Sequence, residues 1–410
     1  MEEKPLERHD LICYGCGATP PPASSLACPV CGDPLSLRAR CTPPQALFAE
    51  ARAPMWHYFD LLPVSRLEHV VSLGEGGTPL IEAPRLAARI GAEHLCIKNE
   101  TANPTGSFKD RQVSVGISHA IEIGADTVTV VSSGNVACAA SAYAARAGLR
   151  AVLLMHGQAA PDKVAMAGAY GGRAIQVDSP SAAAVFDLCL EACSTFGWYH
   201  LSTAGIYNPF NVEGAKTIAY ELYAALGRDL PDWIVAPVGG GGLLGGIWRG
   251  FTDLERARLI DRVPRLAGVQ ARGCAPLKLA LDEGWSFQES LAHPWPNPKT
   301  VAGGIADDVL FDGHTVLAAI RQTNGVAIVV DDFAILEAQR RLAESEGILC
   351  EPTSAVVIAA LDELVLDPGA RVCAVVTGTG FKDISALRAG MTPPTRIGLS
   401  LDALAKRVRA

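Results

Sequence analysis

The sequence predicts an α/β protein built from parallel sheets. Short apolar runs rich in β-branched residues recur along the chain, and several are followed by a polar or Gly-rich turn and then by a helical run rich in Ala and Leu. Such alternation is typical of parallel strands joined by right-handed crossovers. The length of 410 residues and the hydrophobic content of 49% favour two domains with a small additional module.

The expected elements follow in order along the chain. We predict a small module over residues 1–40 and a connecting arm over 41–72, which contains Pro43-Pro44 and the aromatic residues Trp56, Tyr58 and Phe59. Beyond the arm, helices alternate with seven candidate strands, at residues 94–98, 127–131, 151–155, 173–177, 233–236, 265–269 and 372–376.

Composition and charge exclude several classes of function. The net charge is −8, and no basic run is long enough to indicate nucleic-acid binding. Since the chain has no stretch of about 18 uninterrupted apolar residues, we expect no membrane span. The first residues, Met1-Glu2-Glu3-Lys4, open with acid and lack the apolar run of a signal peptide, so we expect a cytoplasmic protein.

Four of the 12 cysteines form two Cys-x-x-Cys pairs, Cys13 with Cys16 and Cys28 with Cys31. A glycine follows each pair, which suits the tight turn that directs backbone N–H groups at a thiolate. Four thiolates at this spacing fit a tetrahedral Zn²⁺ site without an open position, so we predict a structural zinc. The remaining eight cysteines lie in apolar stretches, where we expect small buried side chains, and disulfides are not expected without a secretion signal.

Residues 103–111, with the sequence Asn-Pro-Thr-Gly-Ser-Phe-Lys-Asp-Arg, contain the most informative residue, Lys109. This lysine follows a Gly-Ser turn at the expected start of a helix, where the macrodipole disfavours a cation. A Schiff base with an aldehyde cofactor would consume that charge, and a lowered pKa would make the amine nucleophilic. Taken alone, the pattern also fits an ordinary surface lysine.

Three further turns follow predicted strands. Ser132-Ser133-Gly134-Asn135 presents backbone N–H groups and hydroxyls to an anion. Gly239-Gly240-Gly241-Gly242 lets the backbone wrap closely around a phosphate. This loop lacks the Lys-Ser/Thr ending of a nucleotide P-loop and the dinucleotide fingerprint, so we expect a phosphate carried by neither ATP nor NAD. Thr377-Gly378-Thr379-Gly380 is the third turn.

Together these motifs resemble the fold-type II pyridoxal phosphate (PLP) enzymes, and most closely the threonine synthases. The resemblance runs from about Leu61 to Gly390, and its motifs lie at residues 73–80, 103–111, 351–355 and 377–383. It implies the tryptophan synthase β-like architecture of two open parallel-sheet domains. The large PLP-binding domain would comprise residues 73–111 and 209–395, the small inserted α/β domain 112–208, and a tail 396–410. The cysteine module is similar to the N-terminal zinc ribbon of some threonine synthase-like proteins.

The resemblance also implies roles for single residues. Lys109, next to Phe108, would hold PLP and then move protons. Asn135 would hydrogen bond the phenolic oxygen of PLP, and the N–H groups of Gly239 to Gly242 would bind its phosphate. Thr377 would hydrogen bond the pyridine nitrogen, and a neutral hydroxyl there favours elimination over transamination. For Thr377, a hydroxyl that caps a helix is the alternative interpretation.

The reaction implied is conversion of O-phospho-L-homoserine and water to L-threonine and phosphate, by an enzyme expected to be a homodimer. The substrate carboxylate would be held by Ser132, Ser133 and Gly134. The phosphate group of the substrate would be bound by Thr105, Ser107 and Lys163, although Lys163 fits a solvated helix lysine equally well.

One departure from the family pattern concerns the substrate. Many threonine synthases have an arginine that helps to bind the substrate phosphate at the position of Asn211, and a bidentate arginine is a strong phosphate ligand. Lys216 could supply the missing charge. The four-glycine loop is also closer to that of serine/threonine dehydratases. The alternatives are therefore a dehydratase-like β-eliminating lyase, a cysteate synthase-like enzyme that replaces phosphate with sulfite, and a catalytically silent PLP-binding regulator.

Overall fold

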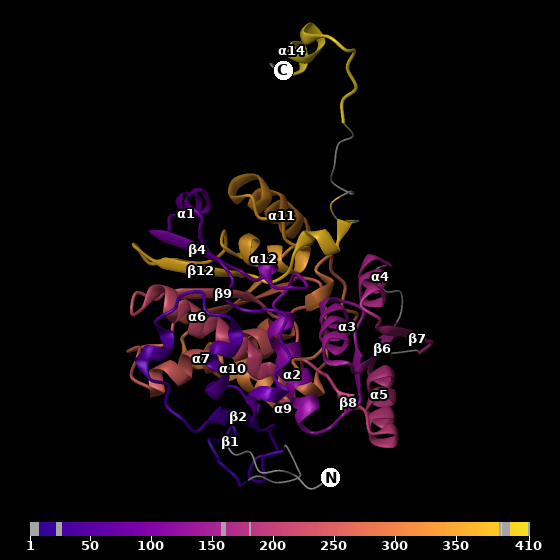
Figure 1. Cartoon of the computed structure of the whole chain (residues 1–410). Coiled ribbons are helices and arrows are strands. Elements are labelled where there is room, and N and C mark those ends of the chain that lie inside the picture. Colours follow the sequence, from indigo (N-terminus) through magenta and orange to yellow (C-terminus); the bar gives the residue numbers. More distant parts are fainter. Residues whose placement is uncertain are drawn as a thin grey trace.

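The computed structural model describes residues 8–21, 27–156, 161–179, 182–384, 387 and 394–408. In this part of the chain, two open sheets form the body and a two-stranded sheet lies at its N-terminal end (Figure 1). The predicted α/β class with parallel sheets is confirmed, and each of the seven predicted strands is present.

The larger sheet has six strands in the order β11-β10-β9-β12-β4-β3. Neighbouring strands are parallel except for β3, which is antiparallel to β4. The strands are β3 (Leu80–Glu82), β4 (His94–Asn99), β9 (Trp233–Pro237), β10 (Arg265–Ala271), β11 (Val326–Val330) and β12 (Arg371–Val376).

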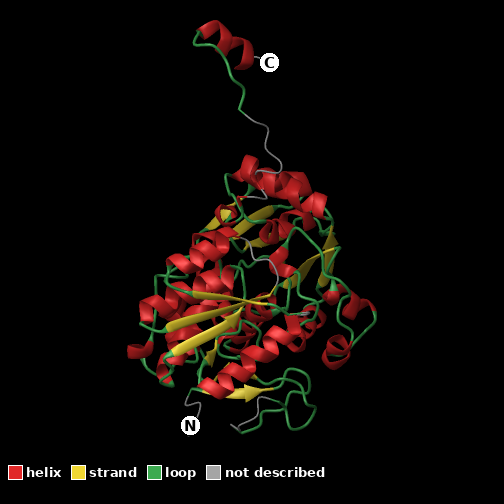
Figure 2. Cartoon of the chain, turned by 90° about the vertical axis from the view of Figure 1, so that its right-hand side faces the viewer, coloured by secondary structure: helices red, strands yellow, loops and turns green. Residues whose placement is uncertain are grey.

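Helices cover both faces of this sheet and bury two separate cores (Figures 1 and 2). One core contains α6 (Thr217–Leu226), α7 (Gly242–Arg256) and α10 (Gly313–Gln322). The other contains α1 (Pro84–Ile90), α11 (Asp332–Glu346) and α12 (Pro352–Ala360). Two shorter helices, α8 (Pro276–Asp282) and α9 (Phe287–Ala292), follow β10.

The smaller sheet is entirely parallel and has the order β7-β6-β5-β8. Its strands are β5 (Thr127–Val131), β6 (Arg150–His156), β7 (Arg173–Val177) and β8 (Tyr199–His200). A core on one face joins the sheet to α2 (Lys109–Glu122), α3 (Asn135–Ala147) and α4 (Pro161–Ala169), and α5 (Ala182–Phe196) packs on the other. The strands of residues 127–200 thus pair with one another rather than with the larger sheet; the domain boundaries given above stay predictions.

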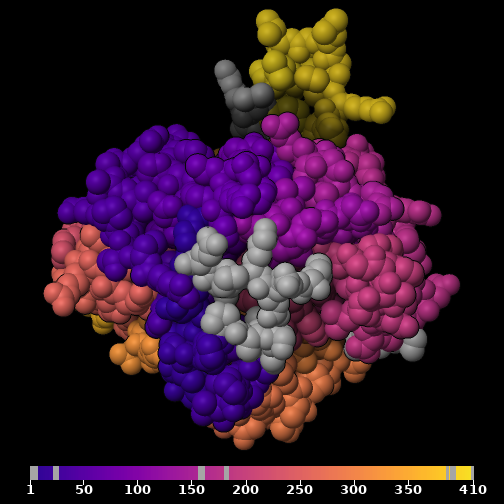
Figure 3. Space-filling view, turned by 60° about the horizontal axis from the view of Figure 1, so that its bottom comes forward, coloured from indigo at the N-terminus to yellow at the C-terminus, as the bar shows by residue number. Residues whose placement is uncertain are grey.

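The N-terminal module packs against the body. Its strands β1 (His9–Ile12) and β2 (Ser36–Ala39) are antiparallel. The Tyr14 ring lies 5.0 Å from the Trp248 ring of α7, and Ser36 hydrogen bonds with His314 of α10 at 3.3 Å. Figure 3 shows this indigo segment on one face of the molecule, beside orange residues of the C-terminal half.

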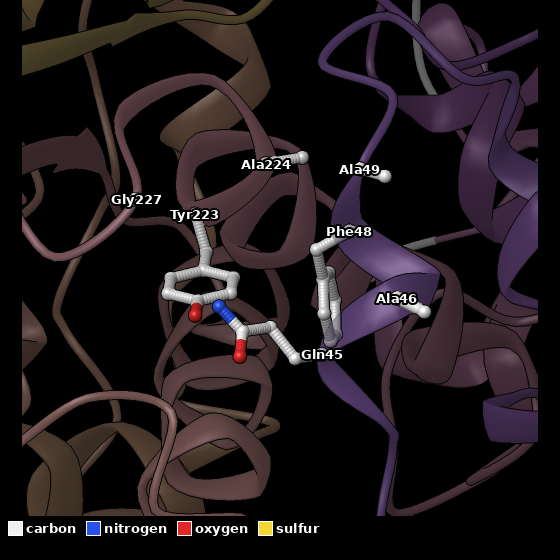
Figure 4. A pocket seen from close by; sticks show the side chains of 7 residues that line it. All are labelled: Gln45, Ala46, Phe48, Ala49, Tyr223, Ala224 and Gly227. Atoms are coloured by element: carbon white, nitrogen blue, oxygen red, sulfur yellow. The ribbon is translucent and has the colours of Figure 1, made fainter.

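The arm contains three 3₁₀ helices, η1 (Gln45–Phe48), η2 (Met55–Leu61) and η3 (Leu67–His69). A pocket of about 400 Å³ lies where η1 meets α6, and the rings of Phe48 and Tyr223 border it with their centroids 5.2 Å apart (Figure 4). At the other end of the chain, α14 (Leu401–Val408) lies apart from the body (Figures 1 and 2). Among the described residues, no helix is long and apolar enough to span a membrane.

The prediction of buried cysteines outside the module is only partly correct. Cys96, Cys138, Cys189, Cys274, Cys350 and Cys373 are buried, but Cys41 is exposed and Cys193 is partly exposed. Cys41 lies directly after the N-terminal module, where its thiol donates to the carbonyl oxygen of Asp60 at 3.3 Å.

Candidate active site

Lys109 is the first residue of α2, as predicted. The turn before it is fixed by backbone hydrogen bonds to the loop after β12, from Phe108 N to Thr377 O at 2.9 Å and from Thr379 N to Gly106 O at 2.9 Å. Gly106 has φ of +78°, and a Cβ there would lie 2.6 Å from a Thr379 methyl carbon. This close approach requires glycine. The backbone therefore fixes Lys109 against the C-terminal motif.

The amine of Lys109 has two neutral acceptors, Thr203 Oγ1 at 3.0 Å and Gln112 Oε1 at 3.2 Å. Burial lowers the pKa of Lys109 from 10.5 to about 8, although the carboxylates of Asp307, Asp312 and Glu351 favour the charged form. Desolvation dominates because none of these carboxylates is among the amine's hydrogen-bond partners. A fraction of the amine is thus neutral, and nucleophilic, near pH 7.

The four-glycine loop joins β9 to α7 and lies next to Lys109. Gly241 has φ of +103°, and a Cβ at Gly242 would lie 3.0 Å from the carbonyl oxygen of Thr203, the residue that accepts from Lys109. The loop therefore presents the start of α7 to the lysine. A helix start with free N–H groups is suited to an anion.

Asn135 begins α3, after the turn that follows β5. Its Nδ2 donates to Glu351 Oε1 at 2.6 Å, and its Oδ1 accepts from Lys382 Nζ at 2.9 Å. Gly134 has nothing within 4 Å of the position of a Cβ, so the turn borders open space. Of the two serines, Ser132 donates its N–H to Leu154 O, and its hydroxyl accepts from Gly134 N.

Glu351 joins Asn135 to a second lysine. The amine of Lys163, on α4, lies 3.3 Å from Glu351 Oε2, and the Glu351 side chain is buried. Lys382 is buried as well, and desolvation lowers its pKa although Glu351 favours its charge. The Asn135 amide thus contacts Lys382 and Glu351, and Glu351 in turn contacts Lys163. We call Asn135, Lys163, Glu351 and Lys382 the two-lysine cluster.

Thr377 is buried at the end of β12, where its hydroxyl hydrogen bonds with the hydroxyl of Ser354 at 2.8 Å. Ser354 also accepts the N–H groups of Thr377 and Gly378, at 3.1 and 2.7 Å. The start of α12 thus holds this loop in place. A Cβ on Gly378 would lie 2.4 Å from Glu351 Oε1, so only glycine fits between the loop and the two-lysine cluster.

Thr105 and Ser107 lie in the turn before Lys109 and are buried. Thr105 donates its N–H and its hydroxyl to the carboxyl of Asp110, whose pKa burial raises to about 7. The hydroxyl of Ser107 has no hydrogen-bond partner among the described residues. Thr105 also lines a cavity of about 590 Å³ that reaches Lys382 and Phe381.

Asn211 begins η5 (Asn211–Lys216) and is fully buried. Its Nδ2 donates to Ser202 O at 2.8 Å, and a Cβ on Gly116 of α2 would lie 2.0 Å from its Oδ1. Lys216 does not supply free charge, because its buried amine pairs with Glu213 and Asp253 at 2.8 Å each. The structure therefore gives no support to Lys216 as a replacement for the expected arginine.

The four predicted metal ligands converge. The Sγ atoms of Cys13, Cys16, Cys28 and Cys31 all lie within 4.8 Å of one another. Each knuckle closes through a backbone hydrogen bond, from Gly17 N to Cys13 O and from Gly32 N to Cys28 O, and both glycines have positive φ. A set of thiolates at this spacing is suited to Zn²⁺.

The comparisons with known proteins agree with this geometry. Residues 71–378, three quarters of the chain, match the model of the family described as "Pyridoxal-phosphate dependent enzyme". The chain belongs to this enzyme family.

Curated relatives of this PLP-dependent enzyme are named threonine synthase. One, from Methanocaldococcus jannaschii, is 37% identical over 359 residues, which cover 86% of each chain. Another, from Synechocystis sp., is 39% identical over 345 residues, or 83% of this chain and 86% of the relative. Among solved structures, maize serine racemase has a TM-score of 0.65 at 22% identity and covers 76% of this chain and 91% of its own; this likeness concerns the fold.

The residues of this PLP-dependent enzyme fit the cofactor of the family. Lys109 has a lowered pKa beside a glycine loop, and two buried polar atoms of the same segment, Ser107 Oγ and Gln112 Nε2, have no partner among the described residues. Buried polar atoms without partners indicate groups that meet a ligand.

Several residues of the site were missed by the sequence analysis. Glu351, Ser354 and Lys382 lie in motifs quoted for the family resemblance, so the signal was present although no role was derived from it. Thr203, Gln112 and Asp307 lie in no recognised motif. Gln112 lies one helical turn after Lys109 on α2, whereas only the tertiary fold brings Thr203 to Lys109 and Asp307 to the glycine loop.

Proposed function

We propose that this PLP-dependent enzyme is a threonine synthase, which converts O-phospho-L-homoserine and water to L-threonine and phosphate. The observation that carries the proposal is the two-lysine cluster. The Lys163 amine pairs with Glu351, and the Lys382 amine donates to Asn135, whose Nδ2 bonds Glu351; Asp110 also favours the charge of Lys382. The two amines suit a phosphorylated substrate, whereas Asn211, at the position of the expected arginine, carries no charge. The names of the curated relatives give independent support.

The proposed roles at the cofactor follow the contacts. Bound PLP would supply the electron sink for chemistry at the α and β carbons of the amino acid. Lys109 would hold PLP and then, as a free amine of lowered pKa, move protons at these carbons. The N–H groups of Gly239, Gly240, Gly241 and Gly242 would bind the cofactor phosphate.

The remaining roles concern the ring and the substrate. Asn135 would contact the phenolic oxygen, Phe108 would lie beside the ring, and Thr377, held by Ser354, would face the pyridine nitrogen. Ser132, Ser133 and Gly134 would bind the substrate carboxylate. The substrate phosphate would meet Lys163 and Lys382, with the hydroxyls of Thr105 and Ser107 nearby. Asn211 would shape the site from behind α2.

A dehydratase-like lyase is the second candidate function. Asn211 in place of arginine and the four-glycine loop favour it. Here serine or threonine would lose its β hydroxyl as water, hydrolysis of the resulting imine would release ammonia and a keto acid, and the two-lysine cluster would bind no phosphate.

The test is a substrate screen on the PLP-loaded protein. O-phospho-L-homoserine should release phosphate and yield an equal amount of L-threonine. Keto acid from serine or threonine without phosphate release would establish the dehydratase instead. Replacement of the phosphate of O-phosphoserine by sulfite would indicate a cysteate synthase-like enzyme, and bound PLP without any turnover would indicate a silent regulator.

We further propose that Cys13, Cys16, Cys28 and Cys31 bind one structural Zn²⁺, that the enzyme is a homodimer, and that it acts in the cytoplasm. Metal analysis should find about one zinc per chain. The variant with all four cysteines changed to serine should lose the metal but keep the chemical step in whatever fraction folds. Stoichiometric zinc in that variant would place the metal elsewhere.

A further inference from the structure

The glycine loop already binds an anionic oxygen of the protein itself. Gly240 donates its N–H to Asp307 Oδ2 at 2.6 Å, and a Cβ on Gly239 would lie 2.5 Å from the same oxygen. Asp307 stands just after the 3₁₀ helix η6 (Gly303–Ile305), and this is the one hydrogen bond of its side chain in the part of the chain that is described. The carboxyl thus takes an N–H group that a bound phosphate would use.

A second carboxyl, that of Asp312, lies beside the same glycine loop. Asp312 accepts the N–H of Gly205 at 2.8 Å, and a Cβ on Gly242 would lie 2.9 Å from Asp312 Oδ2. The Asp312 N–H donates to Gly240 O at 2.7 Å, which ties the backbone after Asp307 to the loop. Two acids beside a phosphate-binding loop oppose a dianionic phosphate, because like charges at this range repel strongly.

The surroundings of Asp307 and Asp312 indicate which of the two carboxyls a bound phosphate could displace. Lys109 favours its carboxylate, whereas Asp308, Asp312 and the thiol of Cys274 face it as acids. Burial raises the pKa of Asp307, although Lys109 and the Gly240 N–H oppose this. Asp312 is buried and accepts the Gly205 N–H, whereas Asp307 is partly exposed and, among the described residues, its side chain bonds only to Gly240.

We propose that Asp307 is an intramolecular competitor for the phosphate-binding loop, so that a phosphorylated cofactor must displace or neutralise this carboxylate before the loop can hold it. The proposal rests on the proposed function in one respect, the binding of the PLP phosphate by Gly239 to Gly242. It makes Asp307 a determinant of cofactor affinity that acts on the phosphate and not on the aldehyde.

The comparison of PLP with pyridoxal, which lacks the phosphate, isolates this effect. The dissociation constants of both are measured by absorbance titration of the cofactor-free protein, for the wild type and for D307N, D307A and the control D308N. Asp308 is the adjacent, exposed acid. D307N and D307A should bind PLP at least about tenfold more tightly relative to pyridoxal, whereas D308N should behave as wild type.

Two results of this titration would overturn the proposal. One is a ratio of PLP to pyridoxal affinity that is unchanged in D307N and D307A. The other is an equal gain for both ligands, which would locate the effect at the Lys109 amine. Inorganic phosphate separates this proposal from the proposed function: it should raise the melting temperature of cofactor-free D307N at a lower concentration than it does for the wild type. That shift would support the role of Asp307 even if PLP failed to bind, and its absence would contradict it.

Discussion

Lys109 and Arg111 stand two residues apart on α2, and their surroundings are opposite. Arg111 is fully buried and donates to Glu100 Oε2 at 2.7 Å, to both oxygens of Glu221 and to Thr78 Oγ1 at 3.1 Å. Lys98 completes this group with a bond to Glu221 Oε2 at 2.6 Å. The Lys109 amine, by contrast, hydrogen bonds among the described residues only to the neutral acceptors Thr203 and Gln112, and it lies 4.6 Å from the centre of the Phe108 ring.

This difference in charge pairing distinguishes the group around Arg111, which we interpret as structural, from the surroundings of Lys109, which we interpret as reactive. Around Arg111, two cations meet two carboxylates, and although burial opposes ionisation, Arg111 and Lys98 lower the pKa of Glu221 to about 2. Every charge has a partner, as a stable buried network requires. Around Lys109, the charge is desolvated without a paired carboxylate. Such unpaired groups are where a protein meets a ligand.

The largest effect on activity is expected from Lys109→Ala. Loss of the amine should lower kcat/KM for O-phospho-L-homoserine by roughly 10²- to 10⁴-fold or more, because the group that we propose to move protons is gone. The free energy of unfolding should change little, since in the described part of the chain the amine hydrogen bonds to two neutral acceptors and to no carboxylate. Phosphate release and urea unfolding measure the two quantities. If the variant instead lost much of its stability and kept its activity, Lys109 would be a structural residue and not the reactive one.

Arg111→Met should have the opposite profile, with stability as the main loss. The variant leaves Glu100 and Glu221 with one cation, so the free energy of unfolding should fall by about 3–5 kcal/mol. The control is Arg150→Ala, which breaks the exposed ion pair between Arg150 and Asp126. That change should cost less than about 1 kcal/mol. Equal urea midpoints for the two variants would show that the Arg111 network is not what stabilises α2.

A smaller and more selective effect is expected at the two-lysine cluster. Lys163→Ala and Lys382→Met should each lower kcat/KM for O-phospho-L-homoserine about ten- to a hundredfold, since each removes one charge-assisted contact. Turnover of serine or threonine, if any, should change far less. Lys278→Ala, at an exposed lysine that pairs with Asp282, is the control. Equal losses on phosphorylated and unphosphorylated substrates would exclude these lysines as phosphate ligands.

The sequence could predict what depends on local pattern. The strands at residues 127–131 and 173–177 have the predicted bounds, because β-branched runs between turns are specified locally. The two- and three-residue strands β8 and β3 are too short to give such a signal. The same holds for the site, where residues in local motifs could be predicted and contacts between distant residues could not. Lys109 and Asn135 stand in motifs, but the contact of Asn135 with Glu351 joins residues 216 positions apart.

Asp307 lay beyond any sequence-based prediction for a similar reason. It reaches Gly240 from 67 residues further along the chain, and an acid beside a phosphate loop runs against the expected chemistry of the motif. The unpaired state of Lys109 was likewise invisible in sequence. Only the positions of Asp307, Asp312 and Glu351 show that the amine lies among carboxylates without bonding to one.

The most direct test of this account is the site and pH dependence of cofactor attachment. PLP is added to the cofactor-free protein, borohydride fixes it, and the labelled peptide is sequenced across a range of pH. The label should lie on Lys109. Because the neutral amine is the nucleophile and burial lowers its pKa from 10.5 to about 8, the labelling rate should rise as the pH passes through about 8 and level off above it. A label on another lysine, or a rate that keeps rising toward pH 10.5, would contradict the central claim.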